Sequence, residues 1–396
     1  MKISISDDRP LRKDFLPFHR PLIGAEEEAE VIQCLRSGWL TTGPRTQEFE
    51  RAFAEYIGCR HAIGLNSCTA GLHLALVGLG IGDRDEVITT PITFPSTANV
   101  IVHQRARPVF ADIDPETLNI DPDKIEERIT PKTKAIIPVH FAGHPCEMDR
   151  ISEIAQKYNL KVIEDAAHAL EAEYHGRKVG VLGDAASFSF YATKNITTGE
   201  GGMLTTNDAE LADKVSILRL HGISRDAWKR YGPEGYKHWE TLYPGYKYNM
   251  FDIQAALGIH QLKKVEKFLE VRRKYVVMYD KAFEKIPEIK ILGRKENIKH
   301  SHYLYIILVK TEDLTTDRDT IMNAIQAQNI GIGIHFRALH LQPYYKNTYG
   351  FKPGDFPNAE HASDRVISLP LYPALTEEDV ADVIEAVRKV ITRYRK

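Results

Sequence analysis

Cysteine is scarce in this sequence, with only four occurrences in 396 residues. The four cysteines, Cys34, Cys59, Cys68 and Cys146, include no Cys-x-x-Cys pair. The chain therefore lacks the spacing of a zinc knuckle and the motif of a thioredoxin-type redox site. Because disulfides are rare in the cytosol, we interpret the four residues as reduced thiols of a cytoplasmic protein.

Long apolar runs and an excess of one charge are also missing. No stretch approaches the roughly 18 apolar residues of a membrane-spanning helix, and the N-terminus has no apolar core typical of a signal peptide. The formal net charge is -2, whereas nucleic acids and anionic membranes favour a basic surface. We therefore expect no nucleic-acid partner and no membrane insertion.

Two motifs occur in the wrong context for the chemistry they suggest. The glycines of 78–82 follow a predicted helix and lead into a strand, which reverses the order of a dinucleotide-binding loop and disfavours a nicotinamide dehydrogenase. His140 and His144 enclose Gly143 and precede Pro145, so the helical spacing of a zinc-binding histidine pair is not expected. We predict no metal site.

The sequence does contain a regular alternation of strand and helix patterns. Short apolar and β-branched runs predict strands at 61–65, 86–89, 108–111, 134–139, 161–164, 184–190 and 202–206. Amphipathic stretches between them predict helices at 69–79, 96–103, 123–128 and 148–158. Such alternation is typical of an α/β protein in which helices cover both faces of a mostly parallel sheet.

The chain length and the remaining patterns predict three parts. Residues 1–23 contain Pro10, Pro17 and Pro21 and are expected to form an irregular N-terminal arm. Residues 24–264 form the predicted large domain and residues 265–396 a smaller α+β domain. A long helix over 252–286 could bridge the two domains, and the predicted elements of the smaller one are strands at 303–309 and 331–336 and helices at 318–328 and 377–392.

Asp165 and Lys194 are the most informative polar residues. Asp165 stands at the predicted carboxyl end of a strand, where open α/β sheets bind ligands. A carboxylate there can hold a protonated ring nitrogen, although it could equally cap the turn that follows. Lys194 follows the predicted strand 184–190 and is placed to form a Schiff base, whereas most lysines are simply solvated.

Other residues near predicted strand ends could complete a ligand site. Cys68 and Thr69 stand at the start of a predicted helix whose free N–H groups suit a phosphate, with an ordinary helix cap as the alternative. Ser189 offers another hydroxyl. Phe94 could stack on a flat ligand or belong to the core, and His168 could face the ligand or pack within its loop.

Considered together, these residues match the needs of pyridoxal phosphate. That cofactor requires a lysine for its aldehyde, an acid for its ring nitrogen, hydroxyls and amides for its phosphate, and a flat face against its ring. Lys194, Asp165, the Cys68–Thr69 helix start and Phe94 supply such groups. The combination favours the cofactor, although each residue alone has an ordinary structural explanation.

Motifs spread over nearly the whole chain carry a family resemblance. They lie at 38–44, 164–169, 187–190 with Lys194, 200–202, 245–250 and 252–256. With these motifs the sequence resembles the DegT/DnrJ/EryC1/StrS family of sugar aminotransferases, which are fold type I pyridoxal-phosphate enzymes. The resemblance implies a seven-stranded, mostly parallel sheet with helices on both faces, a smaller C-terminal α+β domain, and a homodimer with shared active sites.

The resemblance also implies a role for each site residue. Lys194 binds the cofactor covalently, and Asp165 pairs with its ring nitrogen. The remaining residues hold the ring and the phosphate, namely Phe94 and His168 at the ring and Thr69, Ser189 and the backbone of Cys68 at the phosphate. In the loop 245–250 the neighbouring subunit reaches the phosphate, but where many relatives read Gly-Tyr-Asn-Tyr-Arg this chain has Lys247 in place of that asparagine and Asn249 two positions later.

Within the family the chain looks most similar to the 4-amino-4-deoxy-L-arabinose aminotransferase branch. The parallels lie at 16–21, 333–337, 344–345 and 368–371, and they imply that His335, Phe336 and Arg337 approach the substrate. We therefore expect ping-pong transfer from L-glutamate, released as 2-oxoglutarate, to a nucleotide-linked 4-keto-sugar such as a UDP-4-keto-pentose, for cell-surface polysaccharide or lipid A sugar biosynthesis.

Other functions remain as alternatives. The acceptor could be a 4-keto-6-deoxyhexose or a 3-keto nucleotide sugar, or the chain could be a non-catalytic binding or regulatory homologue. A sugar dehydratase on the same fold would carry a histidine in place of the lysine, so Lys194 argues against that reaction.

Overall fold

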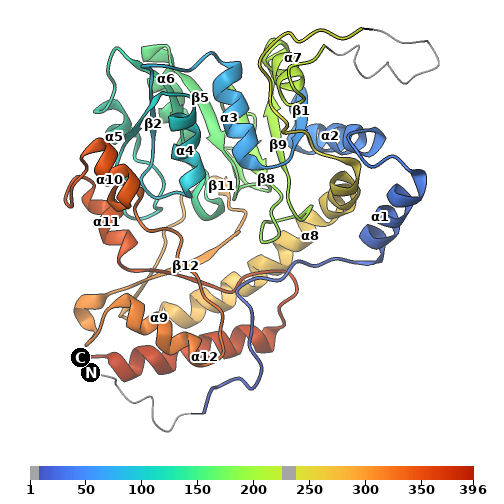
Figure 1. Ribbon diagram of the computed structural model, residues 1–396. Coiled ribbons are helices and arrows are strands. Elements are labelled where there is room, and N and C mark those ends of the chain that lie inside the picture. Colours follow the sequence, from blue (N-terminus) through green and yellow to red (C-terminus); the bar gives the residue numbers. More distant parts are fainter. Residues whose placement is uncertain (1–8, 225–237) are drawn as a thin grey trace.

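A seven-stranded sheet forms the centre of the computed structural model, which describes residues 9–224 and 238–396 (Figure 1). Its strands follow the order β1 (His61–Leu65), β9 (Gly202–Thr206), β8 (Ala185–Ser189), β5 (Lys161–Asp165), β4 (Thr133–Ile137), β2 (Glu86–Thr89) and β3 (Arg107–Phe110). Only β9 runs antiparallel to its neighbours, β1 and β8. The predicted mostly parallel, seven-stranded sheet is confirmed.

Helices cover both faces of this sheet because successive strand residues point to opposite sides. On one face lie α3 (Cys68–Gly78), α4 (Pro95–His103) and α7 (Ala209–Leu218), and on the other lie α2 (Pro44–Ile57), α5 (Pro122–Glu126), α6 (Met148–Tyr158) and the first half of α8 (Asp252–Phe283). Within β5, Ile163 packs with Leu72 of α3, whereas Val162 packs with Ile151 of α6. The central strands are therefore buried on both faces, which explains their continuous apolar runs.

Side-chain caps place two of these helices directly after strands. Ser67 caps α3 by accepting a hydrogen bond from the backbone N–H of Ala70 at 3.1 Å. Asp208 caps α7 in the same way, accepting from the backbone N–H groups of Glu210 and Leu211. Helix α7 was not predicted from the sequence, although its capping aspartate stands only two residues after the end of β9.

Helix α8 is 32 residues long and joins the two cores of the molecule. Its first half packs on α1 (Ala25–Ser37) and α2, while Tyr275, Tyr279 and Phe283 of its second half enter a separate apolar core. That core also contains an antiparallel sheet and two helices, which are β10 (Ile289–Ile291), β12 (Tyr305–Val309), β13 (Val366–Leu369), α9 (Arg318–Gln326) and α12 (Glu377–Tyr394). The proposed division between residues 264 and 265 falls inside this continuous helix and stays a prediction.

Smaller elements fill the junction between the two cores. A second antiparallel sheet has the order β11 (Ile298–Lys299), β6 (Glu173–Tyr174) and β7 (Arg177–Lys178), so it joins the large domain to the chain that leaves α8. The short helices α10 (Pro343–Tyr349) and α11 (Pro357–Ser363) lie beyond it along the chain.

The predicted strand over 331–336 is wrong. Gly331 donates its N–H to Leu16 of the irregular N-terminal arm at 2.7 Å, and Gly333 forms an isolated bridge with Ser368 of β13. Because Gly331 and Gly333 pair with different segments of the chain, no continuous ladder forms. The following residues leave the sheet and turn toward the ends of the central strands.

Three further features concern the part of the chain that the structure describes. None of its helices combines the length and the apolarity needed to cross a bilayer. Across residues 9–224 and 238–396, no three histidine, cysteine or acidic side chains gather as metal ligands would. All four cysteines are free thiols, and Cys34, Cys68 and Cys146 are buried.

Candidate functional site

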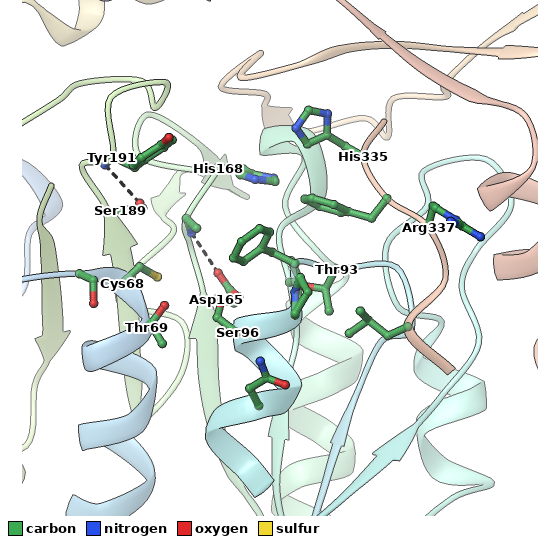
Figure 2. Close-up of a pocket in the computed structure, with 18 of the residues that line it drawn as sticks. Cys68, Thr69, Thr93, Ser96, Asp165, His168, Ser189, Tyr191, His335 and Arg337 are labelled. Atoms are coloured by element: carbon green, nitrogen blue, oxygen red, sulfur yellow. Dashed lines mark hydrogen bonds between the residues drawn. The ribbon is translucent and has the colours of Figure 1, made fainter. Parts of the chain in front are cut away.

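A cavity of about 1250 Å³ opens at the carboxyl ends of the central strands (Figure 2). Parallel strands present their ends, and the loops that follow them, at one edge of the sheet, which is where ligands bind in open α/β folds. The cavity brings together ten of the twelve predicted site residues, namely Cys68, Thr69, Phe94, Asp165, His168, Ser189, Lys194, His335, Phe336 and Arg337. The two exceptions are Lys247 and Asn249.

Lys194 lies in the loop that connects β8 to β9. The loop is held by backbone hydrogen bonds from Lys194 N–H to Tyr191 O and from Thr198 N–H to Phe190 O, both 2.9 Å long. The Lys194 ammonium lies 4.5 Å from the centroid of the Tyr303 ring. A cation over an aromatic face is attracted by the ring quadrupole, so Tyr303 restrains the free end of the lysine side chain.

Asp165 is the last residue of β5 and is almost fully buried. Its carboxylate accepts a hydrogen bond from the Thr97 hydroxyl at 2.7 Å and another from the backbone N–H of Ala167 at 3.2 Å. Burial raises the pKa of Asp165, while these hydrogen bonds and the charge of Lys194 act in the opposite direction. A protonated ring nitrogen in the cavity would offset the burial of this charge.

The start of α3 offers an anion site beside β8 and β9. The first N–H groups of a helix have no partner within the helix and favour a negatively charged group. Cys68 and Thr69 begin α3 and line the cavity together with Ser189 of β8. Gly202 of β9 passes so close that a Cβ atom there would lie 2.3 Å from the carbonyl carbon of Ser67. Only glycine therefore allows β9 to pack against this helix start.

Aromatic rings form one wall of the cavity. The His168 ring stacks on Tyr303 with centroids 4.4 Å apart and on Phe336 at 6.0 Å. Burial, followed by the charge of Lys194, lowers the pKa of His168 well below its ordinary value. Its Nδ1 atom is buried and has no hydrogen-bond partner among the described residues, which leaves it available to a ligand.

Phe94 differs from the other aromatic residues of the site because 60% of its surface is exposed. Its ring lies beside Phe336 with centroids 6.2 Å apart. An exposed phenylalanine directly before α4, at the edge of a cavity, provides an apolar face for a flat ligand. The alternative that Phe94 belongs to the core is wrong.

The segment with His335, Phe336 and Arg337 enters the cavity from the side opposite α3 (Figure 2). His335 Nδ1 lies 2.8 Å from the Ser368 hydroxyl, and burial together with the charge of Lys194 lowers the pKa of His335 to about 3. His335 is therefore a neutral hydrogen-bonding group at neutral pH. Arg337 is exposed and adds a positive charge to the cavity wall.

Lys247 and Asn249 belong to a segment that lies beside the end of β1, where Asn249 forms an antiparallel bridge with Leu65. The Lys247 ammonium donates to the Asn249 side-chain oxygen, and the Asn249 amide donates to the Thr42 hydroxyl, both at 2.7 Å. Asn249 is buried, whereas Lys247 is exposed. Neither residue lines the cavity of its own chain.

Two contacts to the central residues were not predicted from the sequence. Thr97 binds Asp165, although the two residues are 68 positions apart. Tyr303 contacts both Lys194 and His168 from the segment before β12. A buried tyrosine before a strand carries no local signal of function, and no spacing rule connects it to a lysine on another part of the chain.

Comparisons with known proteins agree with this geometry. Residues 21–388 match the model of the DegT/DnrJ/EryC1/StrS aminotransferase family. The chain is 57% identical over 385 residues to an uncharacterized protein of Methanocaldococcus jannaschii, with 97% of this chain and 100% of that protein covered. It is 51% identical over 381 residues to the spore coat polysaccharide biosynthesis protein SpsC of Bacillus subtilis, with 96% and 98% covered.

Solved structures are similar over the same length. A protein of Streptococcus pneumoniae, assigned as a sugar aminotransferase, superposes in its PLP form with a TM-score of 0.89 at 35% identity, covering 96% of this chain and 99% of that one. Its PMP form gives a TM-score of 0.90 at 36% identity with the same coverage. PseC of Helicobacter pylori, an aminotransferase of pseudoaminic acid biosynthesis, gives 0.89 at 33% identity, covering 96% of this chain and all of PseC.

Proposed function

The chain belongs to the DegT/DnrJ/EryC1/StrS aminotransferase family, and from that premise we propose that it transfers the amino group of L-glutamate to a nucleotide-linked 4-keto-sugar. It is a sugar aminotransferase of the fold type I class, and its cofactor is pyridoxal phosphate, as the PLP and PMP forms of its structural neighbours indicate. The observation that carries the finer proposal is the convergence of Lys194, Asp165 and the start of α3 on one cavity.

The residues of the cavity fit the cofactor. The start of α3 and the Ser189 hydroxyl provide donors for its phosphate, and the exposed Phe94 ring provides a face for its ring. Asp165 provides the carboxylate for its ring nitrogen, and the unpartnered Nδ1 atom of His168 provides a further polar contact. Bound there, pyridoxal phosphate supplies an electron sink that allows a C–H bond of the amino donor to be broken.

The chain itself would hold and move protons in this reaction. Lys194 Nζ would take the proton from the donor's α-carbon as general base and deliver it to the bound cofactor as general acid, so that the same amine serves both half-reactions of a ping-pong cycle. Asp165 favours a protonated ring nitrogen by a charge-assisted hydrogen bond. Thr97 keeps this carboxylate oriented through its 2.7 Å hydrogen bond.

The size and charge of the cavity support a nucleotide-linked acceptor. Its volume of about 1250 Å³ exceeds the 300–1,000 Å³ that is typical of sites for one small molecule. The space therefore accommodates a second bulky molecule beside a cofactor. Arg337, exposed on the cavity wall, suits a diphosphate because its guanidinium can donate two parallel hydrogen bonds.

An acceptor panel tests this function. Purified enzyme loaded with cofactor is given L-glutamate and, in separate reactions, a UDP-4-keto-pentose, a 4-keto-6-deoxyhexose nucleotide and a 3-keto nucleotide sugar, and 2-oxoglutarate release is measured. We expect turnover with the 4-keto acceptors and none in Lys194→Ala, which should keep the wild-type fold. Amination of only the 3-keto sugar, or turnover by Lys194→Ala, would contradict the proposal.

We also propose that the active enzyme is a homodimer with shared sites. Large apolar side chains are exposed around the loop that carries Lys247, including Trp39, Leu40, Trp239, Leu242, Tyr243 and Phe251. Single exposed apolar residues are common, but a group of this size usually marks an interface. Of the two candidates in the loop, the exposed Lys247 is suited to reach the neighbour's cofactor phosphate. The buried Asn249 orients Lys247 by accepting a hydrogen bond from its ammonium through the side-chain oxygen, while its amide donates to the Thr42 hydroxyl.

Hybrid dimers test this arrangement. Lys194→Ala and Lys247→Ala each lack one component of every site, so each homodimer should lose most of its activity. If the sites are shared, a mixture refolded or exchanged into hybrids has one site with both residues intact and recovers up to a quarter of wild-type activity. A monomer in light scattering, or hybrids as inactive as the parents, would contradict the proposal.

A further inference from the structure

A buried ion pair lies directly behind the Lys194 loop. Arg272 of α8 and Glu171, which follows β5, form this pair with only 3% and 0% of their side chains exposed. Taking both charges out of water has a cost that the attraction between them often fails to recover. Apolar residues of the same size would frequently give an equally stable or more stable core, so the pair calls for an explanation other than stability.

The hydrogen bonds of this pair reach the segments that hold the site residues. Asn195, the neighbour of Lys194 in the chain, donates its side-chain amide to the second oxygen of Glu171 at 2.6 Å. Arg272 donates to the backbone oxygen of Ser301 at 3.1 Å. Ser301 in turn donates its hydroxyl to the backbone oxygen of His168 at 2.6 Å.

These contacts bind three separate parts of the chain to one point. Asn195 fixes the main chain next to Lys194, while Ser301 fixes the segment that carries Tyr303, whose ring contacts the Lys194 ammonium. A lysine side chain has four rotatable bonds, so its amine is placed accurately only if both its backbone and its free end are held. Glu171 restrains the backbone of the lysine by accepting the hydrogen bond from Asn195. Arg272 orients the contact at the free end by donating to Ser301 in the segment that carries Tyr303.

We propose that Asn195, Glu171 and Arg272 are positioning residues that align Lys194 for its covalent and proton-transfer chemistry. None of the three lines the cavity, so they act through Lys194 and not on a substrate directly. This inference rests on the role proposed above for Lys194. It extends that role to a hydrogen-bond network that connects the Lys194 loop, α8 and the segment with Ser301 that precedes β12.

An exchange of donor and acceptor provides a test that separates positioning from stability. Asn195→Asp places a second carboxylate against Glu171, and Glu171→Gln leaves Arg272 buried without its counter-ion. The double variant Asn195→Asp/Glu171→Gln restores an amide–carboxylate hydrogen bond with the two roles reversed and leaves the total charge unchanged. Asn195→Ala, which removes only the amide, is the variant to measure if neither single exchange folds.

The first readout is the rate at which Lys194 of the apoenzyme captures pyridoxal phosphate, followed by borohydride fixation and the mass of the Lys194 peptide. Lys194→Ala is the control that captures nothing at this position. Because a displacement of about 1 Å can slow a reaction 100-fold, we expect capture to slow about 10- to 100-fold in the single variants and to recover in the double variant. The affinity for pyridoxamine phosphate, which needs no covalent link, should change less than threefold throughout.

Three results would overturn the inference. Capture at the wild-type rate in the single variants, or in Asn195→Ala, would show that the network does not align Lys194. Capture and pyridoxamine phosphate affinity that fall in the same proportion, or a double variant that regains thermal stability but not capture, would show that it only maintains the fold. The assay needs neither amino donor nor sugar, so its outcome is independent of the acceptor panel.

Discussion

Tyr303 offers the most direct test of how the tertiary structure prepares Lys194. The Lys194 ammonium lies 4.5 Å from the centroid of its ring, and the ring also stacks on His168 at 4.4 Å. Only 6% of Tyr303 is exposed, so the contact with the cation is largely shielded from water. Its hydroxyl contributes little, because its closest partner is the Thr193 hydroxyl at 3.4 Å.

The expected effect of Tyr303→Leu follows from this geometry. Lys194 Nζ becomes a cation as it takes up the donor's proton, and a cation on a desolvated aromatic face is stabilised by about 2 kcal/mol. Each 1.36 kcal/mol lost in the transition state slows the reaction tenfold. Without the ring, the amine populates other rotamers, and we expect kcat to fall about 10- to 30-fold. Tyr303→Phe keeps the face of the ring and should remain within about twofold of the wild type.

Single-turnover kinetics of the two half-reactions is the appropriate assay. Lys194 serves both half-reactions, so Tyr303→Leu should slow them by the same factor and leave the KM of each substrate nearly unchanged. The rates are expressed per bound cofactor, so that a loss of folded protein does not enter. Wild-type rates in Tyr303→Leu would refute the reasoning, and an equal loss in Tyr303→Phe would assign the effect to the hydroxyl instead.

Three further substitutions test the neighbouring contacts. Thr97→Val removes the hydrogen bond to Asp165, and a hydrogen bond to a charged acceptor is worth about 1.5–3 kcal/mol. We expect this variant to bind the cofactor at least tenfold more weakly in a fluorescence titration, while Thr97→Ser should stay near the wild type. Asp165→Asn removes a carboxylate whose pKa is raised by burial. The wild-type apoenzyme should lose stability as the pH rises through that pKa, whereas the apo form of the variant should not. The melting temperature of the variant should therefore exceed that of the wild type at pH 8, and the difference should vanish in acid. Gly202→Ala places a methyl group 2.3 Å from the Ser67 carbonyl carbon. It should lower the stability by about 1–3 kcal/mol and weaken phosphate binding. At Gly82 the added methyl group would have no atom closer than 3.8 Å, so Gly82→Ala should change the stability little.

The strand-end residues show how far local patterns reach. Asp165 was placed correctly because the apolar run before it predicts a strand, and the edge at which parallel strands end is common to the whole sheet. The same reasoning placed Cys68, Phe94 and Lys194 around one cavity. It failed for 331–336, because β-branched residues predict a strand only where a neighbouring strand offers a continuous ladder, and here the partners change from Leu16 to Ser368.

The sequence by itself determined the alternation of strands and helices, the strand ends that carry the polar residues, and the motifs that identify the family, because each of these depends on residues close together in the chain. Only the tertiary structure decided that Thr97 meets Asp165, that Tyr303 covers Lys194, and that Arg272 and Glu171 are buried behind Asn195. These contacts join positions far apart in the chain, and their distances follow from how α4, α8 and the smaller domain pack against the sheet. Lys194 could be recognised from its local sequence, but what holds it in place could not.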